Sequence, residues 1–430
     1  MSAPLLFQAS SDRIVRIPRV KILLSLLIFT PLVYGPDGDP YRAFEVMAIG
    51  MLALMVALPS LLCLQVWQRA GASAVPAICM LILVQPAVVP LADVVYNLKF
   101  AAVMLFAFLP GLYLSNLKRP CSGAELRFLT RALMVVFHVS VLSLLVTAVT
   151  GVGEVYTEGG AFQRRVFSWL GDGFAPVMVF FLYYYLFARK PIGAIVSMVC
   201  IVLLMQSKMS AGMAVFGFVT YLFVVGSRRT RILVLAGAGS TVVATPLLLQ
   251  LLSQNLHNFD YSFNNRLLSY NAGVEFFLSS PWLGVGANQT FSILSNNSFE
   301  STRELYESEI PFYDFFQIHN AFLRALAELG IVGFTLLLLF CGTVIRRSWN
   351  TLRQVHLQPS PQRRALVSAC ALWLLSFIIF HQTTGWFEPG HPQLGWLVCF
   401  LCLMNFVRTT APRQHASRLA KPHHSSTAVY

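Results

Sequence analysis

Long apolar stretches alternate with short polar segments along most of the chain. A helix needs about 20 predominantly apolar residues to cross the hydrocarbon core of a bilayer. By this criterion the pattern predicts an all-α polytopic membrane protein with about twelve transmembrane helices. The predicted spans are residues 20–35, 43–66, 74–90, 98–117, 128–150, 174–188, 191–206, 211–226, 232–252, 320–343, 365–382 and 393–409.

Two of the polar segments between these spans are long enough to carry structure of their own. Residues 151–173 form the smaller loop and residues 253–319 the larger one. In the larger loop, NNRLLSYNAGVEFFLSS has apolar residues at helical spacing and precedes Pro281, which favours an amphipathic helix ending there. The predicted parts of the chain are membrane helices one to nine with the smaller loop (1–252), the larger loop (253–319), membrane helices ten to twelve (320–409) and a basic tail (410–430).

The composition agrees with a membrane protein. Of the 430 residues, 56% are hydrophobic and only 11% are charged, whereas soluble domains carry about 25% charged residues. The first apolar stretch follows basic residues without a small-residue cleavage site, so we expect a retained span rather than a removed signal peptide. Cys399 and Cys402 lie inside an apolar stretch and are interpreted as packing residues of a span rather than a redox or metal-binding pair.

The net charge of +13 is distributed unevenly over the predicted loops. With both termini in the cytoplasm, most of the 31 basic residues fall in inside segments, and most of the 18 acidic residues fall outside. Retention of Lys and Arg on the cytoplasmic side is the asymmetry that sets membrane topology. The positive charge therefore favours twelve spans with cytoplasmic termini, and a nucleic-acid partner is not needed to explain it.

Several ionisable and polar residues gather instead at the outer ends of the spans. They are Arg164 and Arg165 in the smaller loop, Lys208 between two spans, Arg266 in the larger loop, His319 and Asn320 at the outer mouth of the tenth span, and His381, Glu388 and His391 in the last outward loop. Ionisable groups at membrane level are costly and usually functional. Several cations beside lipid favour binding of an anionic headgroup, above all a diphosphate. Two simpler roles stay open, because boundary cations also anchor helices at the interface and an Asn also suits a helix N-cap.

Two motifs lie at the end of the larger loop and the start of the tenth span. RLLSYNAGVEFFLSSPWLGVGANQTF contains Pro-x-x-Gly-x-Gly, and HNAFLRALAELGIVG has His-Asn opening a helix that ends near Glu-x-Gly-x-x-Gly. Together with RRVFSWLGDGFAPVMVF and QSKMSAGMAV upstream, they resemble the signature of the O-antigen ligase and polymerase superfamily over roughly residues 160–340. Lys208 departs from the pattern, because the family usually has Arg there. Lys keeps the charge but loses the two-donor phosphate geometry of Arg.

The resemblance implies a membrane glycosyltransferase of the C-type architecture, with its active site on the periplasmic face of the bacterial inner membrane. Such an enzyme takes glycan from an undecaprenyl-diphosphate carrier and uses no nucleotide sugar, metal or cofactor.

The resemblance also implies residue roles. His319 would be the general base that takes a proton from the acceptor hydroxyl, and Asn320 would orient the imidazole or cap the helix. Direct displacement would invert the anomeric centre. The cations that hold the diphosphate and stabilise it as the leaving group would be Arg266, Lys208 and either Arg165 or Arg164.

The acceptor is open between two members of the superfamily. A polymerase transfers glycan onto another lipid-linked repeat unit of an O-antigen or exopolysaccharide, and a ligase transfers it onto lipid A–core. HNAFLRALAELGIVG resembles the polymerases slightly better, so we prefer a polymerase and keep a ligase as the alternative. A transporter or flippase is a remote alternative, which would predict broken helices and paired charges near the bilayer midplane. The sequence indicates neither feature.

Overall fold

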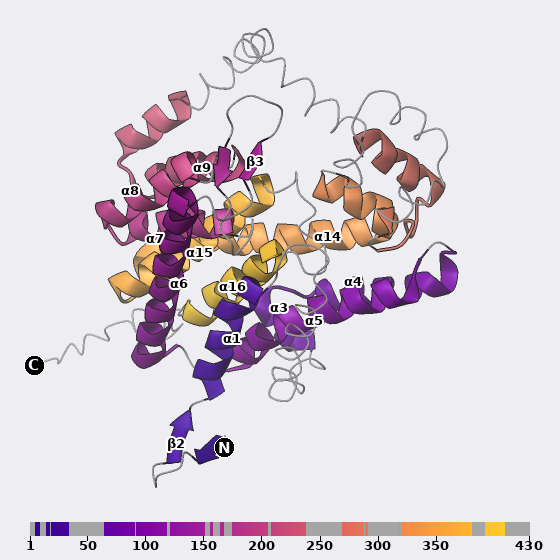
Figure 1. Ribbon diagram of the computed structural model, residues 1–430, viewed down its shortest axis with the longest axis horizontal. Helices are drawn as coiled ribbons and strands as arrows, with labels where there is room; N and C mark the ends of the chain where they lie inside the picture. Colours follow the sequence, from indigo (N-terminus) through magenta and orange to yellow (C-terminus); the bar gives the residue numbers. More distant parts are fainter. Residues whose placement is uncertain are drawn as a thin grey trace, which may run out of the picture.

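The computed structural model of the chain is predominantly helical, with two short β-hairpins (Figure 1). The residues that the structure describes are 5–8, 14–17, 19–33, 64–90, 92–117, 121–150, 155–157, 164–166, 174–204, 208–237, 269–287, 289–290, 318, 320–380 and 392–408.

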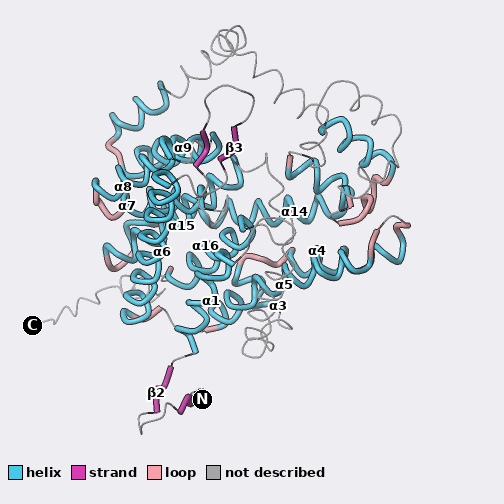
Figure 2. The backbone as a smooth tube through the Cα atoms, in the orientation of Figure 1, coloured by secondary structure: helices cyan, strands magenta, loops and turns pink. Residues whose placement is uncertain are grey.

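Figure 2 shows that helices make up most of the described part of the chain. Their bounds are α1 Arg19–Val33, α3 Leu64–Ala70, α4 Val75–Val88, α5 Val94–Asn116, α6 Gly123–Thr150, α7 Phe174–Phe187, α8 Pro191–Val199, the π-helix η1 Cys200–Leu204, α9 Lys208–Val225, α14 Ala321–Arg353, the 3-10 helix η2 Val355–Leu357, α15 Pro361–Phe380 and α16 Pro392–Val407. Two further helices occupy residues 228–237 and 269–279.

Helices occupy most of the predicted spans within the described ranges. The second span, 43–66, lies almost wholly outside them, and of the ninth only residues 232–237 are described. By length and apolar composition, three described helices can cross a membrane: α6 over Gly123–Val146, α14 and α15. The pair α3 and α4 makes a fourth candidate, although it is bent by 116°. The chain is therefore a helical membrane protein, and the count of twelve stays a prediction.

The two hairpins are features that the hydrophobic pattern did not predict. Strand β1 (Leu5–Gln8) pairs with β2 (Ile14–Ile17), and β3 (Val155–Thr157) pairs with β4 (Arg164–Val166), both antiparallel. Strands of three or four residues are too short for the alternation that identifies a strand in sequence. The second hairpin lies in the smaller loop.

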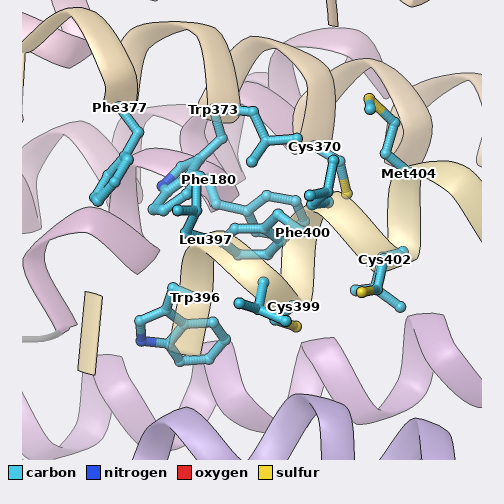
Figure 3. Close-up of a cluster of buried hydrophobic side chains, with 14 of the residues drawn as sticks. Phe180, Cys370, Trp373, Phe377, Trp396, Leu397, Cys399, Phe400, Cys402 and Met404 are labelled. Carbon is cyan, nitrogen blue, oxygen red and sulfur yellow. The ribbon is translucent and has the colours of Figure 1, made fainter. Parts of the chain in front are cut away.

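The main core is centred on α15, which packs against α7, α9, α14 and α16. Every side chain of residues 365–378 is buried, as expected for a helix that is apolar on all sides. The rings of Trp373 and Phe377 stack with centroids 4.6 Å apart, and those of Phe180 and Phe400 with centroids 4.2 Å apart (Figure 3). Aromatic stacking and large buried areas make this cluster a strong source of stability.

Both members of the cysteine pair belong to this core. The Cys399 and Cys402 side chains are completely buried and form no disulfide. The Cys402 sulfur fills the space beside Gly111 of α5, where a Cβ would overlap it. The pair therefore packs as small apolar side chains between helices (Figure 3).

Basic residues from segments predicted to lie on one side of the membrane meet in space. The Arg347 guanidinium donates to the carbonyl of Arg69 at 2.7 Å, and Arg363 donates to the carbonyl of Cys121 at 2.6 Å. Arg408 donates to the Gln354 side-chain oxygen at 2.6 Å. The contacts join the ends of α3, α14, α15 and α16 with the start of α6 at one end of the bundle.

A second, smaller core lies beside the first turns of α14. It consists of Ala272, Phe276, Val285, Ile318 and Ala327, with Leu323 packed against it. Figure 1 shows the helix at residues 269–279 beside the beginning of α14. That helix stops just before Pro281, as the sequence predicted, but its apolar positions Val274 and Leu278 are exposed. Its smaller residues Ala272 and Gly273 are buried instead, because they permit close approach to α14.

Candidate functional site

The candidate site is built around the beginning of α14. Asn320 has extended backbone angles, and its Oδ1 accepts hydrogen bonds from the backbone N–H groups of Phe322 and Leu323, each at 3.0 Å. The first N–H groups of a helix have no partner within the helix, so this side chain satisfies two of them. Of the two roles expected for Asn320, the structure shows helix capping. The cap also fixes the direction in which the chain enters α14.

A buried ion pair lies one turn further along α14. The Arg324 Nε is 2.9 Å from Glu328 Oε1, and the two side chains are only 5% and 7% exposed. Thr290 donates a hydrogen bond from its hydroxyl to the same carboxylate oxygen at 2.6 Å. A buried pair is tolerated only when its geometry is good and other hydrogen bonds satisfy it. Arg324 is thus a structural cation, held in place by Glu328.

Gln85 connects this region to the membrane helices. It is fully buried in α4, and its Nε2 donates to the carbonyls of Leu283 at 2.6 Å and Glu328 at 2.7 Å. Its Oε1 accepts from the backbone N–H of Ala287 at 3.2 Å and from Asn97 Nδ2 at 3.3 Å. One amide therefore joins α4, α5, the turn after the helix at 269–279, and α14.

Asn97 compensates for a proline inside α4. Pro86 has no N–H group, so the carbonyl of Ile82 loses its usual helical partner. The Asn97 side chain in α5 donates to that carbonyl at 2.7 Å. The Ile82 carbonyl oxygen, which has no helical donor, is therefore hydrogen-bonded within the protein, as an apolar environment requires.

Glycines allow the turn to pack directly against the α14 backbone. Gly284, Gly286 and Gly330 all have positive φ. A Cβ on Gly284 would overlap the backbone of Glu328, and one on Gly330 would overlap the carbonyl of Trp282. Both motifs singled out in the sequence, Pro-x-x-Gly-x-Gly and Glu-x-Gly, therefore meet at one contact. Figure 2 shows this turn against the first part of α14.

The same contact explains why α14 is broken at Gly330. Gly330 has φ 64° and ψ −170°, which no helix contains. The turn supplies replacement partners: the N–H of Val285 donates to the Ala327 carbonyl at 2.9 Å, and the N–H of Ile331 donates to the Pro281 carbonyl at 2.9 Å. The break is therefore stabilised by specific hydrogen bonds between turn and helix.

The remaining predicted site residues are described only in part. Arg266 and His319 lie outside the described residues. Arg164 and Arg165 lie in β4, where they pair with Thr157 and Tyr156, and Lys208 is the first residue of α9. The structure describes only the backbone of these three residues. Among the predicted site residues, Asn320 is therefore the one whose side chain it places. No group of three His, Cys, Asp or Glu residues that could hold a metal ion occurs in the described part of the chain.

Sequence reasoning missed Gln85, Thr290 and the Arg324–Glu328 pair. A signal existed for two of these: Gln85 is a polar residue in an apolar stretch beside a proline, and Arg324 and Glu328 are spaced i,i+4 on a helix. The structure also contains a broken helix and a buried charge pair, two features that the transporter alternative predicts. Here the turn closes the break and Thr290 bonds the pair, so neither feature is left open to a transport path.

The comparisons with known proteins point to the same region. Residues 193–338 match the family model described as O-antigen ligase. That range contains α8, α9, the helix at 269–279, the glycine turn and the first half of α14. No curated protein matches the chain. The matched region contains both motifs that meet at Gly330, so this part of the chain is similar to the O-antigen ligase family.

Proposed function

We propose that this protein is a glycosyltransferase of the bacterial inner membrane. It transfers glycan from an undecaprenyl-diphosphate carrier to an acceptor hydroxyl at the periplasmic face. The observation that carries the proposal is the construction of the helix start at Asn320, within the region that matches the O-antigen ligase family. The proposal includes twelve membrane helices in the C-type glycosyltransferase arrangement, with both termini in the cytoplasm.

The reaction needs a base and a stabilised leaving group. In the proposal, His319 takes the proton from the acceptor hydroxyl as its oxygen attacks the anomeric carbon. Imidazole suits this role near neutral pH because its ordinary pKa is about 6.5. The bond between the anomeric carbon and the diphosphate oxygen breaks, and the diphosphate leaves with its electron pair. Because the acceptor oxygen attacks from the opposite side, the reaction inverts the anomeric centre.

Cations near the leaving group lower the barrier by stabilising the charge that develops on the diphosphate. Arg266, Lys208 and Arg165 or Arg164 have this role in the proposal. Arg supplies two parallel donors to phosphate oxygens, and Lys supplies a point charge. The reaction proposed for these residues uses no metal and no nucleotide sugar.

The hydrogen bonds that hold the start of α14 support this assignment. The Asn320 cap and the Arg324–Glu328 pair hold the first turns of α14, and Gln85 ties those turns to α4. Catalysis depends on holding reacting groups in a productive geometry, and second-layer hydrogen bonds are a common means of doing so. In the proposal, the base at residue 319 directly precedes this fixed helix start in the sequence.

Two acceptors are compatible with this chemistry. We propose a lipid-linked repeat unit of an O-antigen or exopolysaccharide, which makes the protein a polymerase. The alternative is lipid A–core, and the family match is compatible with both acceptors. The reacting groups are the same in both cases, so the acceptor-binding surface determines which of the two acceptors is used.

Reconstitution of the full chain tests the function and separates the two acceptors. Purified protein in liposomes is supplied with a defined undecaprenyl-diphosphate repeat unit, with and without lipid A–core, and the glycolipids are resolved by gel. A ladder formed without core supports the polymerase, and product formed only with core identifies a ligase. Absence of product in both reactions, with correctly folded protein, contradicts the proposed transfer.

A further inference from the structure

A cavity of about 540 Å³ lies at the end of α14 opposite Asn320. Its walls come from the end of α7, the end of α9, the helix at residues 228–237, the end of α14, η2 and the start of α15. From Gly330 to Arg353 an α-helix rises about 34 Å, which is close to the hydrocarbon thickness of about 30 Å. The cavity therefore lies at the opposite membrane boundary from the candidate glycosyltransferase site.

The rim of this cavity is strongly basic. Arg189, Arg231, Arg353, His356 and Arg364 all line it, and their residues are exposed. None of its lining residues, all in the described part of the chain, is acidic. These cations come from three segments far apart in sequence, so the fold assembles them. Repulsion among them is unfavourable unless an anion or solvent offsets it.

Three of the rim arginines differ from other arginines at the same end of the bundle, whereas Arg231 donates to the carbonyl of Val224 at 3.4 Å. Arg347 and Arg363 bind backbone carbonyls at helix ends. Within the described residues, the side chains of Arg189, Arg353 and Arg364 make no hydrogen bond or ion pair. Three guanidinium groups are thus free to bind an anion, and phosphate matches their paired donors.

The floor of the cavity is apolar and aromatic. Leu352 is completely buried there, and the rings of Phe187 and Tyr221 pack edge to face with centroids 5.1 Å apart. Trp349 adds an indole at the boundary. A free phosphate would use the rim only, whereas a lipid would use both parts, with its phosphate on the arginines and its acyl chain on the floor. Basic pockets between helices at the cytoplasmic face are typical sites for anionic lipid headgroups.

We propose that this cavity binds the headgroup and upper acyl chain of an anionic phospholipid from the cytoplasmic leaflet. The ligand class is a phosphate diester without a compensating ammonium group. This site is separate from the proposed transfer site, because the length of α14 lies between them.

Lipid binding to the purified full chain tests the proposal. Native mass spectrometry counts bound phosphatidylglycerol and phosphatidylethanolamine at matched concentrations, for wild type and for R353Q/R364Q. The matched control is R228Q/R229Q, which removes two exposed cations of the adjacent helix that do not line the cavity. We expect phosphatidylglycerol binding to weaken about 10-fold in the cavity variant and less than twofold in the control.

Two further results decide between lipid and free phosphate. Wild type should show a higher Tm with phosphatidylglycerol than with phosphatidylethanolamine, and the cavity variant should lose that difference while keeping the Tm of lipid-free wild type. Equal loss of lipid in both double variants would overturn the site, since it would indicate general surface charge. A Tm increase with inorganic phosphate that matches the increase with lipid would overturn the lipid assignment.

Discussion

At the scale of single residues, the clearest assignment is that of Asn320. Its side chain accepts two backbone hydrogen bonds at the start of α14. The residue before it in sequence is His319, the proposed base. The cap therefore stabilises the helix start that directly follows the proposed base in the sequence.

Asn320→Ala removes both cap hydrogen bonds. The loss should destabilise the helix start by about 1 kcal/mol and reduce glycan transfer, because the proposed base directly precedes this helix start in the sequence. Asn320→Ser, which can still cap, should restore most of both properties. Thermal unfolding and transfer are measured on the same preparations. Full activity in Asn320→Ala would remove Asn320 from any positioning role.

At the scale of elements, the break in α14 and the turn against it form one structure. Gly330 has backbone φ and ψ angles that other residues avoid, and a Cβ at this position would overlap the Trp282 carbonyl. The turn bonds both sides of the break, at Ala327 and Ile331. The two family motifs are thus explained by packing between backbones.

Gly330→Ala should destabilise the protein by at least about 3 kcal/mol, because strain and backbone overlap add. Gly342 provides a matched control on the same helix. A Cβ there meets no atom within 4 Å, so Gly342→Ala should be neutral or stabilising by about 0.5–1 kcal/mol. Thermal unfolding in detergent compares them. Similar Tm values for the two variants would contradict the described break.

The comparison of sequence and structure is instructive at this scale. Apolar length was enough to predict α6, α14 and α15, and Pro281 was enough to predict where the preceding helix ends. The break at Gly330 was not predicted, because its hydrogen bonds come from the turn at residues 281–287. Nor was the hairpin containing Arg164 and Arg165, since its strands are only three residues long.

At the scale of the whole molecule, Gln85 joins two cores. The main core is centred on α15, and the smaller one contains Phe276, Val285 and Ala327. Gln85 bridges them by bonding the turn and α14 from its place in α4. Periodicity cannot reveal such a link, because its partners are about 200 residues away in sequence.

Gln85→Leu keeps the volume but leaves buried carbonyls at Leu283 and Glu328 without their donor. The expected destabilisation is about 3 kcal/mol, since each unsatisfied buried group costs about 1–3 kcal/mol. Gln362→Leu, at an exposed position of α15, is the control for the added apolar surface. Thermal unfolding compares both variants with wild type. An unchanged Tm in Gln85→Leu would show that the bridge contributes nothing.

Catalysis at His319 is the central claim of this account. The direct measurement is glycan transfer from the undecaprenyl-diphosphate donor by His319→Ala, with His138→Ala as the control for loss of an exposed histidine on α6. The account predicts that His319→Ala folds with a Tm near that of wild type and loses transfer at least 100-fold, the lower range for a general base, while His138→Ala stays active. Transfer by His319→Ala at a rate near that of wild type would contradict the account.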